Sequence, residues 1–449
     1  MKYSLRILLL LLTVSLLLTS QTPLLHSGPM VGYGQMTEVM LWVKTTKAAS
    51  VQYQYWDVTS PALKLKSRIS KTTEEGSFIT KTVIDGLKPG KKFEYELLID
   101  GKPVKRPYPL KFQTQPLWQW RTDPPAFSVA FGSCAFVNEA DADRPGKPYG
   151  SDFGIFTTIV SKNPDLFIWG GDNTYLRDPD FFSRAAIIRR YSLTRELPEL
   201  QALLGGVHNY ATWDDHDYGS NDADRTYPLK DVTLETFKIF WANQTYGADD
   251  VKGVFSRFTW GDVDFFLLDD RFHRSPNNAP NDESKTMFGK EQMQWLKDCL
   301  ANSTAPFKFI MNGNQVLNAD GEFYEAMPQF TKEYAELVAY IKQNRIPGII
   351  FLSGDRHHTE LVVHTDSTFY PLYDFTSSSL TAGLNTPLSG KELKNPSRVE
   401  GTLVNDQHNF GMLRFSGPRT NRVVTMECYD LPGSLRWSKQ IRANDLIVK

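Results

Sequence analysis

Four consecutive residues, Asp214, Asp215, His216 and Asp217, place three carboxylates and one imidazole directly after a short apolar run. Two carboxylates about 4 Å apart in a partly buried setting repel each other by several kcal/mol. Such a cluster needs either full solvation or a compensating cation. A bound metal ion is the chemistry that these residue types support most directly.

Polar or charged residues end five other apolar runs in the same way. The six endings are Gly132–Cys134, Asp172–Tyr175, Asp214–Asp217, Asp269–Arg271, Asn312–Gln315 and Ser353–His358. The carboxyl ends of the strands in an α/β sheet converge on one crevice, so these side chains are expected to meet. A single aspartate after a strand is usually a helix N-cap or an Asx-turn. Six such endings in one chain favour one polynuclear metal site instead.

The types of the candidate ligands narrow the choice of metal. The hard oxygen donors are Asp172, Asp215, Asp355 and either Asp217 or Asn221. These donors suit calcium, magnesium, manganese or ferric iron, whereas His357 accepts most metals. Cys134 and Tyr175 favour a trivalent ion, because only a concentrated positive charge keeps a thiolate and a phenolate deprotonated near neutral pH. Taken alone, Cys134 would be better interpreted as an inert buried thiol.

The order of these motifs resembles that of a known family. The segments FGSC, GGDNTY, WDDHD, LDDR, SGDRHH and FTSSSLT occur in the order typical of the alkaline phosphatase D (PhoD-like) metallophosphatases. The resemblance implies a metallophosphoesterase-like α/β core of two β-sheets flanked by helices, preceded by a small fibronectin type III-like β-sandwich. It also implies an alkaline phosphatase or phosphodiesterase with iron (Fe3+) and calcium at its site, with manganese, magnesium or zinc as alternatives.

The resemblance also implies roles for individual residues. The metal ligands would be Asp172 as a bridge, Cys134 and Tyr175 on iron, and Asp355 and His357 to complete the cluster. His216 would face the leaving group as the proton donor. The chain departs from the family pattern in reading DDHD for DDHE and LDDRF for LDTRQ, and in placing Arg356 where an apolar residue is typical. The exact metals and the substrate range therefore stay open.

Charged residues beside the ligands are candidates for positioning groups. We expect Asp214 to orient His216 or a metal ligand. Arg271 or Arg274 would hold the non-transferring phosphoryl oxygens through bidentate hydrogen bonds. For both arginines, a structural salt bridge with Asp269 or Asp270 is an equal alternative.

Two other functions fit parts of the pattern. Cys134 as a nucleophile with His216 as its base would make an exported thiol hydrolase, but it leaves the carboxylate-bearing endings unexplained. A non-catalytic wall- or glycan-binding protein on a degenerate scaffold would carry eroded ligands, and the motifs show no erosion. We therefore expect a metal-dependent phosphoester hydrolase that acts on a small-molecule or polymer substrate.

The hydrophobic patterns place these motifs in the second of two domains. From residue 22 to 115, the segments EVMLWVK, SVQYQYWD, FITKTVIDGL and KKFEYELLID alternate apolar and polar residues, which predicts an antiparallel β-sandwich. Pro116, Pro124 and Pro125 mark a linker over residues 116–126. From 127 to 449, apolar runs alternate with helix-like segments such as DFGIFTTIVSKN, SRAAIIRRYSLTREL, GKEQMQWLKDCLANS and FTKEYAELVAYIKQN. That alternation predicts a layered α/β catalytic domain.

Residues 1–21 have the features of a secretory signal peptide. Lys2 and Arg6 precede an apolar core from Ile7 to Leu18, which is too short to span a bilayer. We expect an exported protein, periplasmic or extracellular, with no transmembrane span once the signal is removed.

Net charge and cysteine content limit the possible binding partners and disulfide bonds. A formal net charge of -1 gives no broad attraction for nucleic acid, so no specific nucleic-acid binding is expected. Cys299 and Cys428 are the candidate disulfide pair, which leaves Cys134 unpaired. The oligomeric state stays open.

Overall fold

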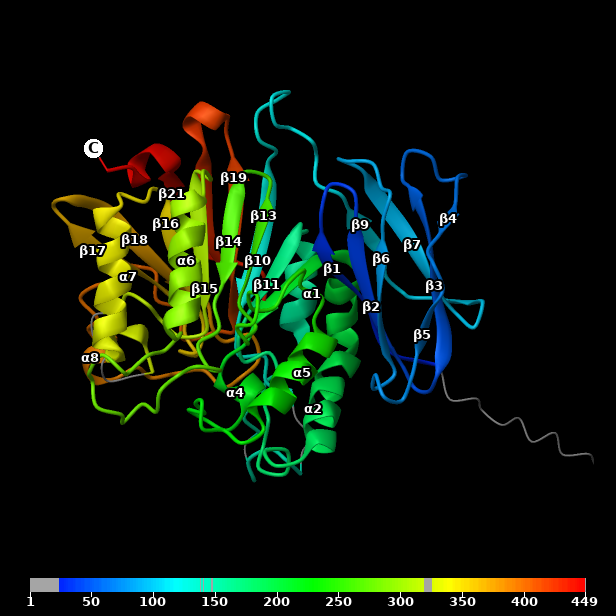
Figure 1. Ribbon diagram of the computed structural model, residues 1–449, viewed down its shortest axis with the longest axis horizontal. Helices are drawn as coiled ribbons and strands as arrows, with labels where there is room; N and C mark the ends of the chain where they lie inside the picture. The colour runs from blue at the N-terminus through cyan, green and yellow to red at the C-terminus, as the bar shows by residue number, and fades with distance from the viewer. Residues whose placement is uncertain (1–23, 138, 140, 147, 319–324, 449) are drawn as a thin grey trace, which may run out of the picture.

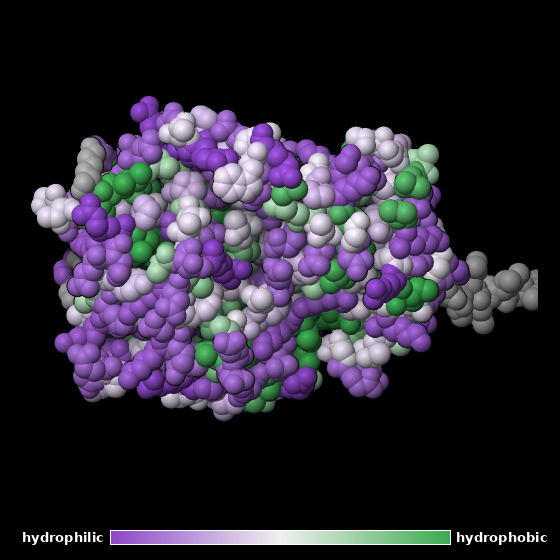
Figure 2. All heavy atoms as spheres, turned by 45° about the horizontal axis from the view of Figure 1, so that its top comes forward, coloured by the Kyte–Doolittle hydropathy of each residue, from purple (hydrophilic) through white to green (hydrophobic). Residues whose placement is uncertain are grey.

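Two large β-sheets face each other in the body of the protein, and a third, smaller sheet lies at its N-terminal end (Figure 1). The computed structural model describes residues 24–137, 139, 141–146, 148–318 and 325–448, so the predicted signal peptide lies outside the described residues. The face seen in Figure 2 is mainly hydrophilic, with hydrophobic residues in small separate patches. The predicted α/β core of two sheets flanked by helices is confirmed.

The first sheet has nine strands in the order β21-β20-β19-β10-β11-β12-β1-β2-β6. Their bounds are β21 (Leu435–Arg442), β20 (Val423–Asp430), β19 (Asn409–Ser416), β10 (Phe127–Gly132), β11 (Leu166–Gly170), β12 (His208–Thr212), β1 (Leu25–Gly34), β2 (Val39–Thr45) and β6 (Ile79–Ile84). Strands β10, β11 and β12 are parallel, so their carboxyl ends share one edge of the sheet.

The second sheet has six strands in the order β13-β14-β15-β16-β18-β17. Their bounds are β13 (Ser256–Trp260), β14 (Val263–Leu267), β15 (Phe307–Asn312), β16 (Ile349–Ser353), β18 (Phe369–Thr376) and β17 (Glu360–Asp366). Strands β14, β15, β16 and β18 are parallel to one another. The strands are buried along their lengths, which explains why the sequence shows continuous apolar runs here and not alternation.

Aromatic side chains fill the space between the two sheets. Phe131 of β10 meets Phe375 of β18 edge-on with ring centroids 4.8 Å apart, and Phe265 of β14 meets Phe309 of β15 at 5.5 Å. Helices cover the outer faces (Figure 1). They are α1 (Gly154–Ser161), α2 (Arg184–Glu196), α3 (Gln201–Gly206), α4 (Asp215–Tyr218), α5 (Lys230–Phe240), α6 (Lys290–Asn302), α7 (Thr331–Gln343) and α8 (Gly390–Leu393).

The N-terminal β-sandwich shares a sheet with the core. Its outer sheet consists of β4 (Leu65–Lys66), β3 (Ala49–Asp57), β7 (Lys92–Ile99) and β8 (Lys102–Val104), with β5 (Ser70–Thr72) and β9 (Lys111–Gln113) at the margins. Its inner sheet is β1, β2 and β6, and β1 also pairs in parallel with β12. The sandwich therefore continues the nine-stranded sheet. The sequence patterns did not indicate β1, because a strand buried on both faces does not alternate.

The four predicted helical segments form α1, α2, α6 and α7. In α2 the hydroxyl of Ser183 accepts a hydrogen bond from the backbone N–H of Ala186, which is the expected N-cap. Among the described residues, no helix is long and apolar enough to cross a membrane.

The candidate disulfide is absent. Cys134, Cys299 and Cys428 are all free thiols in the described part of the chain. The sequence left this pairing open; Cys299 lies on α6 against the six-stranded sheet, whereas Cys428 is buried in β20 of the nine-stranded sheet.

Candidate metal centre

The carboxyl ends of the parallel strands bring the chemistry-bearing residues of both sheets to one edge of the molecule. Three groups of potential metal-ligating atoms form there, each with all atoms within 4.8 Å of one another. They are Cys134–Asp172–His357, Asp172–Asp215–His216 and Asp215–Asp222–Glu325. Because Asp172 and Asp215 each belong to two groups, the three make one continuous array.

Several of these residues adopt backbone conformations that are unusual for any residue except glycine. Positive φ angles occur at Cys134 (59°), Asp172 (54°), Asp355 (65°) and His357 (55°). A left-handed conformation of this kind is costly and concentrates at functional sites, where the surrounding fold enforces it. Here it turns the side chains that follow β10, β11 and β16 toward a common centre.

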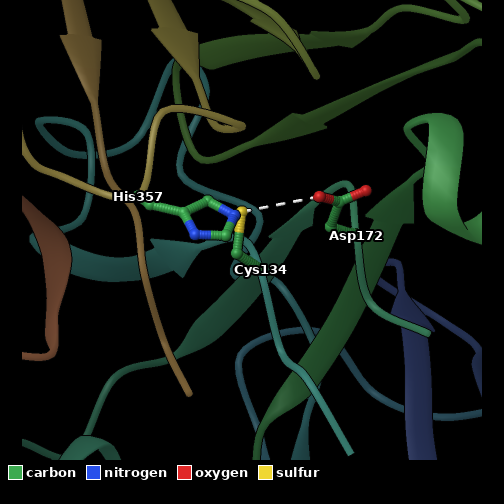
Figure 3. Close-up of side chains that lie close together, drawn as sticks. All are labelled: Cys134, Asp172 and His357. Atoms are coloured by element: carbon green, nitrogen blue, oxygen red, sulfur yellow. Dashed lines mark hydrogen bonds between the residues drawn. The ribbon is translucent and has the colours of Figure 1, made fainter. Parts of the chain in front are cut away.

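Cys134, Asp172 and His357 lie side by side between the strand ends (Figure 3). The Cys134 Sγ lies 3.6 Å from the Asp172 Oδ2 and accepts a hydrogen bond from the Ser378 hydroxyl at 3.1 Å. Burial among protein atoms raises the pKa of Cys134 to about 11. A thiolate at this position therefore requires a cation next to the sulfur.

Tyr175 closes the same pocket from the β11 side. Its hydroxyl donates a hydrogen bond to the Asp172 Oδ2 at 3.1 Å and lies 3.5 Å from the His357 Nε2. Burial, followed by the charge of Asp172, raises the pKa of the phenol well above its usual value. Tyr175 thus places an ionisable oxygen in the same shell as the Cys134 thiol.

Asp172 is a buried carboxylate that lies close to other negatively charged groups. It is 1% exposed, and its pKa is raised well above the usual value by burial and by the charge of Asp215. Among the described residues, no lysine or arginine forms a salt bridge with Asp172 or Asp215. Protonation or a cation from outside the chain would neutralise the pair, and a bound cation is the expectation raised by the run Asp214–Asp217. We call Cys134, Asp172, Tyr175, Asp215 and His357 the Asp172 cluster.

Arg271 is the centre of a second charged group, which the protein neutralises itself. Its guanidinium is fully buried, donates to the Asp214 Oδ1 at 2.6 Å and contacts Glu325 at 2.8 Å. Arg274, also fully buried, lies 3.1 Å from Glu325. Burial alone would raise the pKa of Glu325, but the two arginines hold it well below its usual value. We call Asp214, Asp270, Arg271, Arg274 and Glu325 the Arg271 cluster.

The sequence of this chain matches the profiles of two known protein families. The sequence profile of the PhoD-like phosphatases matches residues 130–423, more than half of the chain. The chain belongs to the PhoD-like phosphatase family. A second profile, a domain of unknown function (DUF7800), matches residues 22–117. Family membership makes the protein a hydrolase of the phosphatase class.

Individual relatives of this PhoD-like phosphatase agree with the family assignment. Alkaline phosphatase D of Bacillus subtilis (strain 168) is 23% identical over 415 residues, which cover 77% of this chain and 67% of the relative. A solved structure of PhoD superposes with a TM-score of 0.73 at 16% identity, covering 94% of this chain and 92% of that one. The purple acid phosphatase PPD1 of yellow lupin (Lupinus luteus) has a TM-score of 0.66 at 12% identity, covering 94% and 76%. The two structures show that the fold is shared.

His216 of this PhoD-like phosphatase lies against the Asp172 cluster in an arrangement that the sequence did not indicate. Its ring stacks on Tyr175 with centroids 4.3 Å apart, and its Nδ1 is buried without a hydrogen-bond partner among the described residues. The family resemblance implied that His216 would be the proton donor, a role that a protonated imidazole fits. Burial instead lowers the pKa of His216, even though Asp215 favours the charged form.

The positions of Asp214 and Arg271 differ from the sequence-based expectation. Asp214 accepts hydrogen bonds from Arg271 and from the Asn314 amide at 3.1 Å, so it orients these groups and not His216. Burial raises the pKa of Asp214 even beside Arg271, because Asp270 also lies close. The main partners of Arg271 are therefore Asp214 and Glu325, while Asp270 lies 3.7 Å away.

Two of the expected oxygen ligands have other surroundings. The Asp217 carboxylate accepts backbone N–H groups of Asn173 and Asp214 at 3.1 Å, which ties two strand-end loops together. Asn221 is exposed, and its neighbour Asp222 places a carboxylate beside Asp215 instead. The backbone N–H of Asp222 donates to the Asp215 Oδ2 at 2.7 Å, so the turn itself fixes this arrangement.

Asp355 lies at the margin of the array. It belongs to none of the three groups formed by the described residues, and its carboxylate is 3.7 Å from the Arg356 guanidinium. Burial raises its pKa, and the charges of Glu325 and Asp215 add to the effect. Asp355 thus shares the electrostatic environment of the array, and its role as a ligand stays a prediction.

Sequence reasoning missed three residues of the site. Asp222, Glu325 and Tyr149 all reach the array, the last through a hydrogen bond of 2.9 Å between its hydroxyl and the His357 Nδ1. Tyr149 and Glu325 lie in loops outside the motifs, and no spacing in the sequence marks them. The acidic pair Asp222 and Asp224, shortly after the run Asp214–Asp217, was the one available signal.

Proposed function

We propose that the protein is an exported, metal-dependent phosphoester hydrolase. The observation that carries this proposal is the pair Asp172 and Asp215, buried side by side without a protein cation among the described residues. Family membership limits the reaction to the phosphatase class. Metals supply the missing positive charge, and the apolar N-terminal segment supplies the export signal.

The types of ligand atom suggest that two kinds of metal would bind in different parts of the array. The thiol of Cys134, the phenol of Tyr175, the imidazole of His357 and the carboxylate of Asp172 would hold iron as Fe3+, and Asp172 would be shared with the neighbouring ligand group. The carboxylate oxygens of Asp215 and Asp222 would suit calcium, while Arg271 and Arg274 already neutralise Glu325, the third member of that group. When bound, such ions lower the pKa of a coordinated water and neutralise the phosphoryl oxygens on both sides of an in-line displacement.

The chain itself supplies the proton for the leaving group. We assign this step to His216, whose plane is fixed by stacking on Tyr175 and whose Nδ1 has no partner among the described residues. A neutral imidazole carries one N–H that can donate a hydrogen bond to the departing oxygen, and transfer of a proton uses the imidazolium form, which the charge of Asp215 favours. Asp214 and Arg271 act as positioning residues, since both are buried and bound to each other.

A thiol hydrolase is a weaker proposal. Burial raises the pKa of Cys134 to about 11, which is the wrong direction for a nucleophile. Among the described residues, no hydrogen bond joins the Cys134 sulfur to His216; the sulfur instead contacts Asp172, Ser133 and Ser378. A non-catalytic binding protein is also disfavoured, because the ligand array is intact.

Turnover of p-nitrophenyl phosphate and bis-p-nitrophenyl phosphate with and without chelator tests the proposal. We expect hydrolysis of at least one ester, loss of activity on chelation, recovery on adding metal back, and resistance to iodoacetamide. Charge transfer from the Tyr175 phenolate to ferric iron should also give visible absorption, which Tyr175→Phe should shift. Full activity in the chelated protein would contradict metal dependence, and inactivation by iodoacetamide alone would favour the thiol enzyme.

A further inference from the structure

A second pocket lies at the opposite edge of the sheets from the metal centre. It has a volume of about 560 Å³ and is lined by Trp118, Trp120, Arg257, Asp264, Asn302 and Arg419, among other residues. Its lining includes Pro124 and Asp262, which lie just before β10 and β14, so the pocket sits at the starts of these strands. A six-residue strand such as β10 spans about 20 Å, which separates this pocket from the residues at the strand ends. It is therefore independent of the metal centre.

Trp120 is the most conspicuous residue of this pocket. It is 92% exposed, and its backbone has a φ of 64°, which is unusual for a bulky residue. The turn that presents it is held by backbone hydrogen bonds of 3.0 Å from Arg121 and Thr122 to the Trp118 carbonyl. An ordered turn thus holds an indole face in solvent next to a cavity. Exposed aromatic surface that is rimmed by polar groups marks a ligand site.

Two residues that line the pocket each carry a buried polar atom with no hydrogen-bond partner within the described chain. The two atoms are the indole Nε1 of Trp118, a donor, and the side-chain Oε1 of Gln119, an acceptor. Buried polar atoms are normally paired, so an unpaired donor beside an unpaired acceptor calls for an explanation. A hydroxyl group satisfies both kinds of partner, because it donates one hydrogen bond and accepts two.

The charges of the pocket are already neutralised within the protein. Arg257 pairs with Asp264 at 2.8 Å, and Asp262 pairs with Arg422 at 2.9 Å. The Arg419 guanidinium lies 5.6 Å from the centre of the Trp118 ring. With its acids and most of its cations paired, the pocket favours a neutral ligand over a phosphate or an amine.

We propose that this pocket binds a neutral glycan. The C–H face of a pyranose ring would stack on Trp120, while its hydroxyl groups would pair with the Trp118 Nε1 and the Gln119 Oε1 once these two side chains turn toward the cavity. Asn302 and Thr304 add further hydrogen-bonding groups at the rim. The pocket would hold the protein on a polysaccharide while the metal centre at the other edge remains accessible. This inference does not depend on the proposed hydrolase activity.

Calorimetric titration of the mature chain with chitotetraose and maltotetraose tests the proposal. We expect saturable binding of at least one tetrasaccharide, weakened about tenfold or more by Trp120→Ala, the loss typical of a stacked tryptophan anchor. Trp118→Phe keeps the ring but removes the N–H, and should weaken binding severalfold through the lost hydrogen bond. Trp120→Ala should leave p-nitrophenyl phosphate turnover unchanged, which also shows that the variant is folded.

Phe182→Ala is the matched control, because Phe182 is another exposed aromatic residue, at 77%, and lies in a different pocket. It should bind the tetrasaccharides as the wild type does. Absence of saturable binding of both sugars, or equal binding by Trp120→Ala and the wild type, would overturn the proposal. Binding of a polyproline peptide in place of either sugar would also overturn it, in favour of a peptide site.

Discussion

The Asp172 and Arg271 clusters lie next to each other and solve the same electrostatic problem in different ways. In the Arg271 cluster, two buried arginines face Asp214 and Glu325, and the pKa of Glu325 is held low. In the Asp172 cluster, the carboxylates of Asp172 and Asp215 face a thiol, a phenol and imidazoles, and the pKa of Asp172 is raised. Arginines that the protein itself supplies face the carboxylates of the first cluster, whereas Asp172 and Asp215 have no salt bridge among the described residues, and there we propose the metals.

The largest effect is expected from Asp172→Asn. The substitution removes the carboxylate shared by two ligand groups, and with it several kcal/mol of charge stabilisation in the transition state, so turnover should fall by about 10³-fold or more. Elemental analysis of the same sample should show loss of more than one metal ion. Asp85→Asn, at an exposed position of the β-sandwich, is the control and should behave as wild type. Normal turnover with full metal in Asp172→Asn would mean that the site has been misplaced.

A large effect on stability is expected from Arg271→Met. Loss of one partner in a buried ion pair leaves Asp214 without an arginine and Glu325 with Arg274 alone, which costs about 3–5 kcal/mol in the free energy of unfolding. Urea unfolding measures this cost. Lys252→Met, which breaks an exposed pair with Asp231, should leave the free energy of unfolding nearly unchanged. Similar costs for the two variants would refute the distinction between the clusters.

A more selective effect is expected from His216→Ala. General acid catalysis typically contributes about 10²–10⁴-fold and matters most for poor leaving groups. The variant should therefore retain its metals and lose far more activity on alkyl phosphate esters than on nitrophenyl esters. Equal losses on both substrates would deny the proton-donor role, and missing metal would make His216 a ligand.

The smallest expected effect is a dependence of stability on pH in the protein from which the metals have been removed. Burial raises the pKa of both Asp217 and Asp222 to about 7, whereas an aspartate in an unfolded chain titrates near 4. Between these values the folded chain binds more protons, so stability is full below about pH 4 and is lost as the pH rises through 7. The Tm of chelated protein should fall across this window, and that of metal-loaded protein should not. Parallel curves for the two forms would count against a role of the metals in neutralising the array.

Much of the fold and many of the ligands were accessible from the sequence. Buried parallel strands appear as apolar runs, and the polar residues that follow them must share an edge, so Cys134, Asp172 and His357 could be grouped without coordinates. The helix-like segments that form α2 and α7 were likewise recognisable in the sequence. In these cases the information is local, or depends on a rule common to all α/β sheets.

The remainder depends on contacts that no local pattern encodes. The partnership of Arg271 with Glu325 joins residues 54 positions apart, and Glu325 follows no motif. The pairing of β1 with β12 joins the sandwich to the core. The sequence does not indicate β1, because Gly28 and Pro29 are uncommon within strands. A single turn decides whether Asn221 or Asp222 places a side-chain oxygen beside Asp215.

Metal content of the protein purified without chelators tests the central claim most directly. The account predicts more than one metal ion per chain, including iron, with activity proportional to occupancy. Arg271→Met that remains folded should keep the same metal set, because its cluster is neutralised by the protein. A wild-type protein that turns over phosphoesters while free of metal would contradict the claim that the Asp172 cluster is completed by cations from outside the chain.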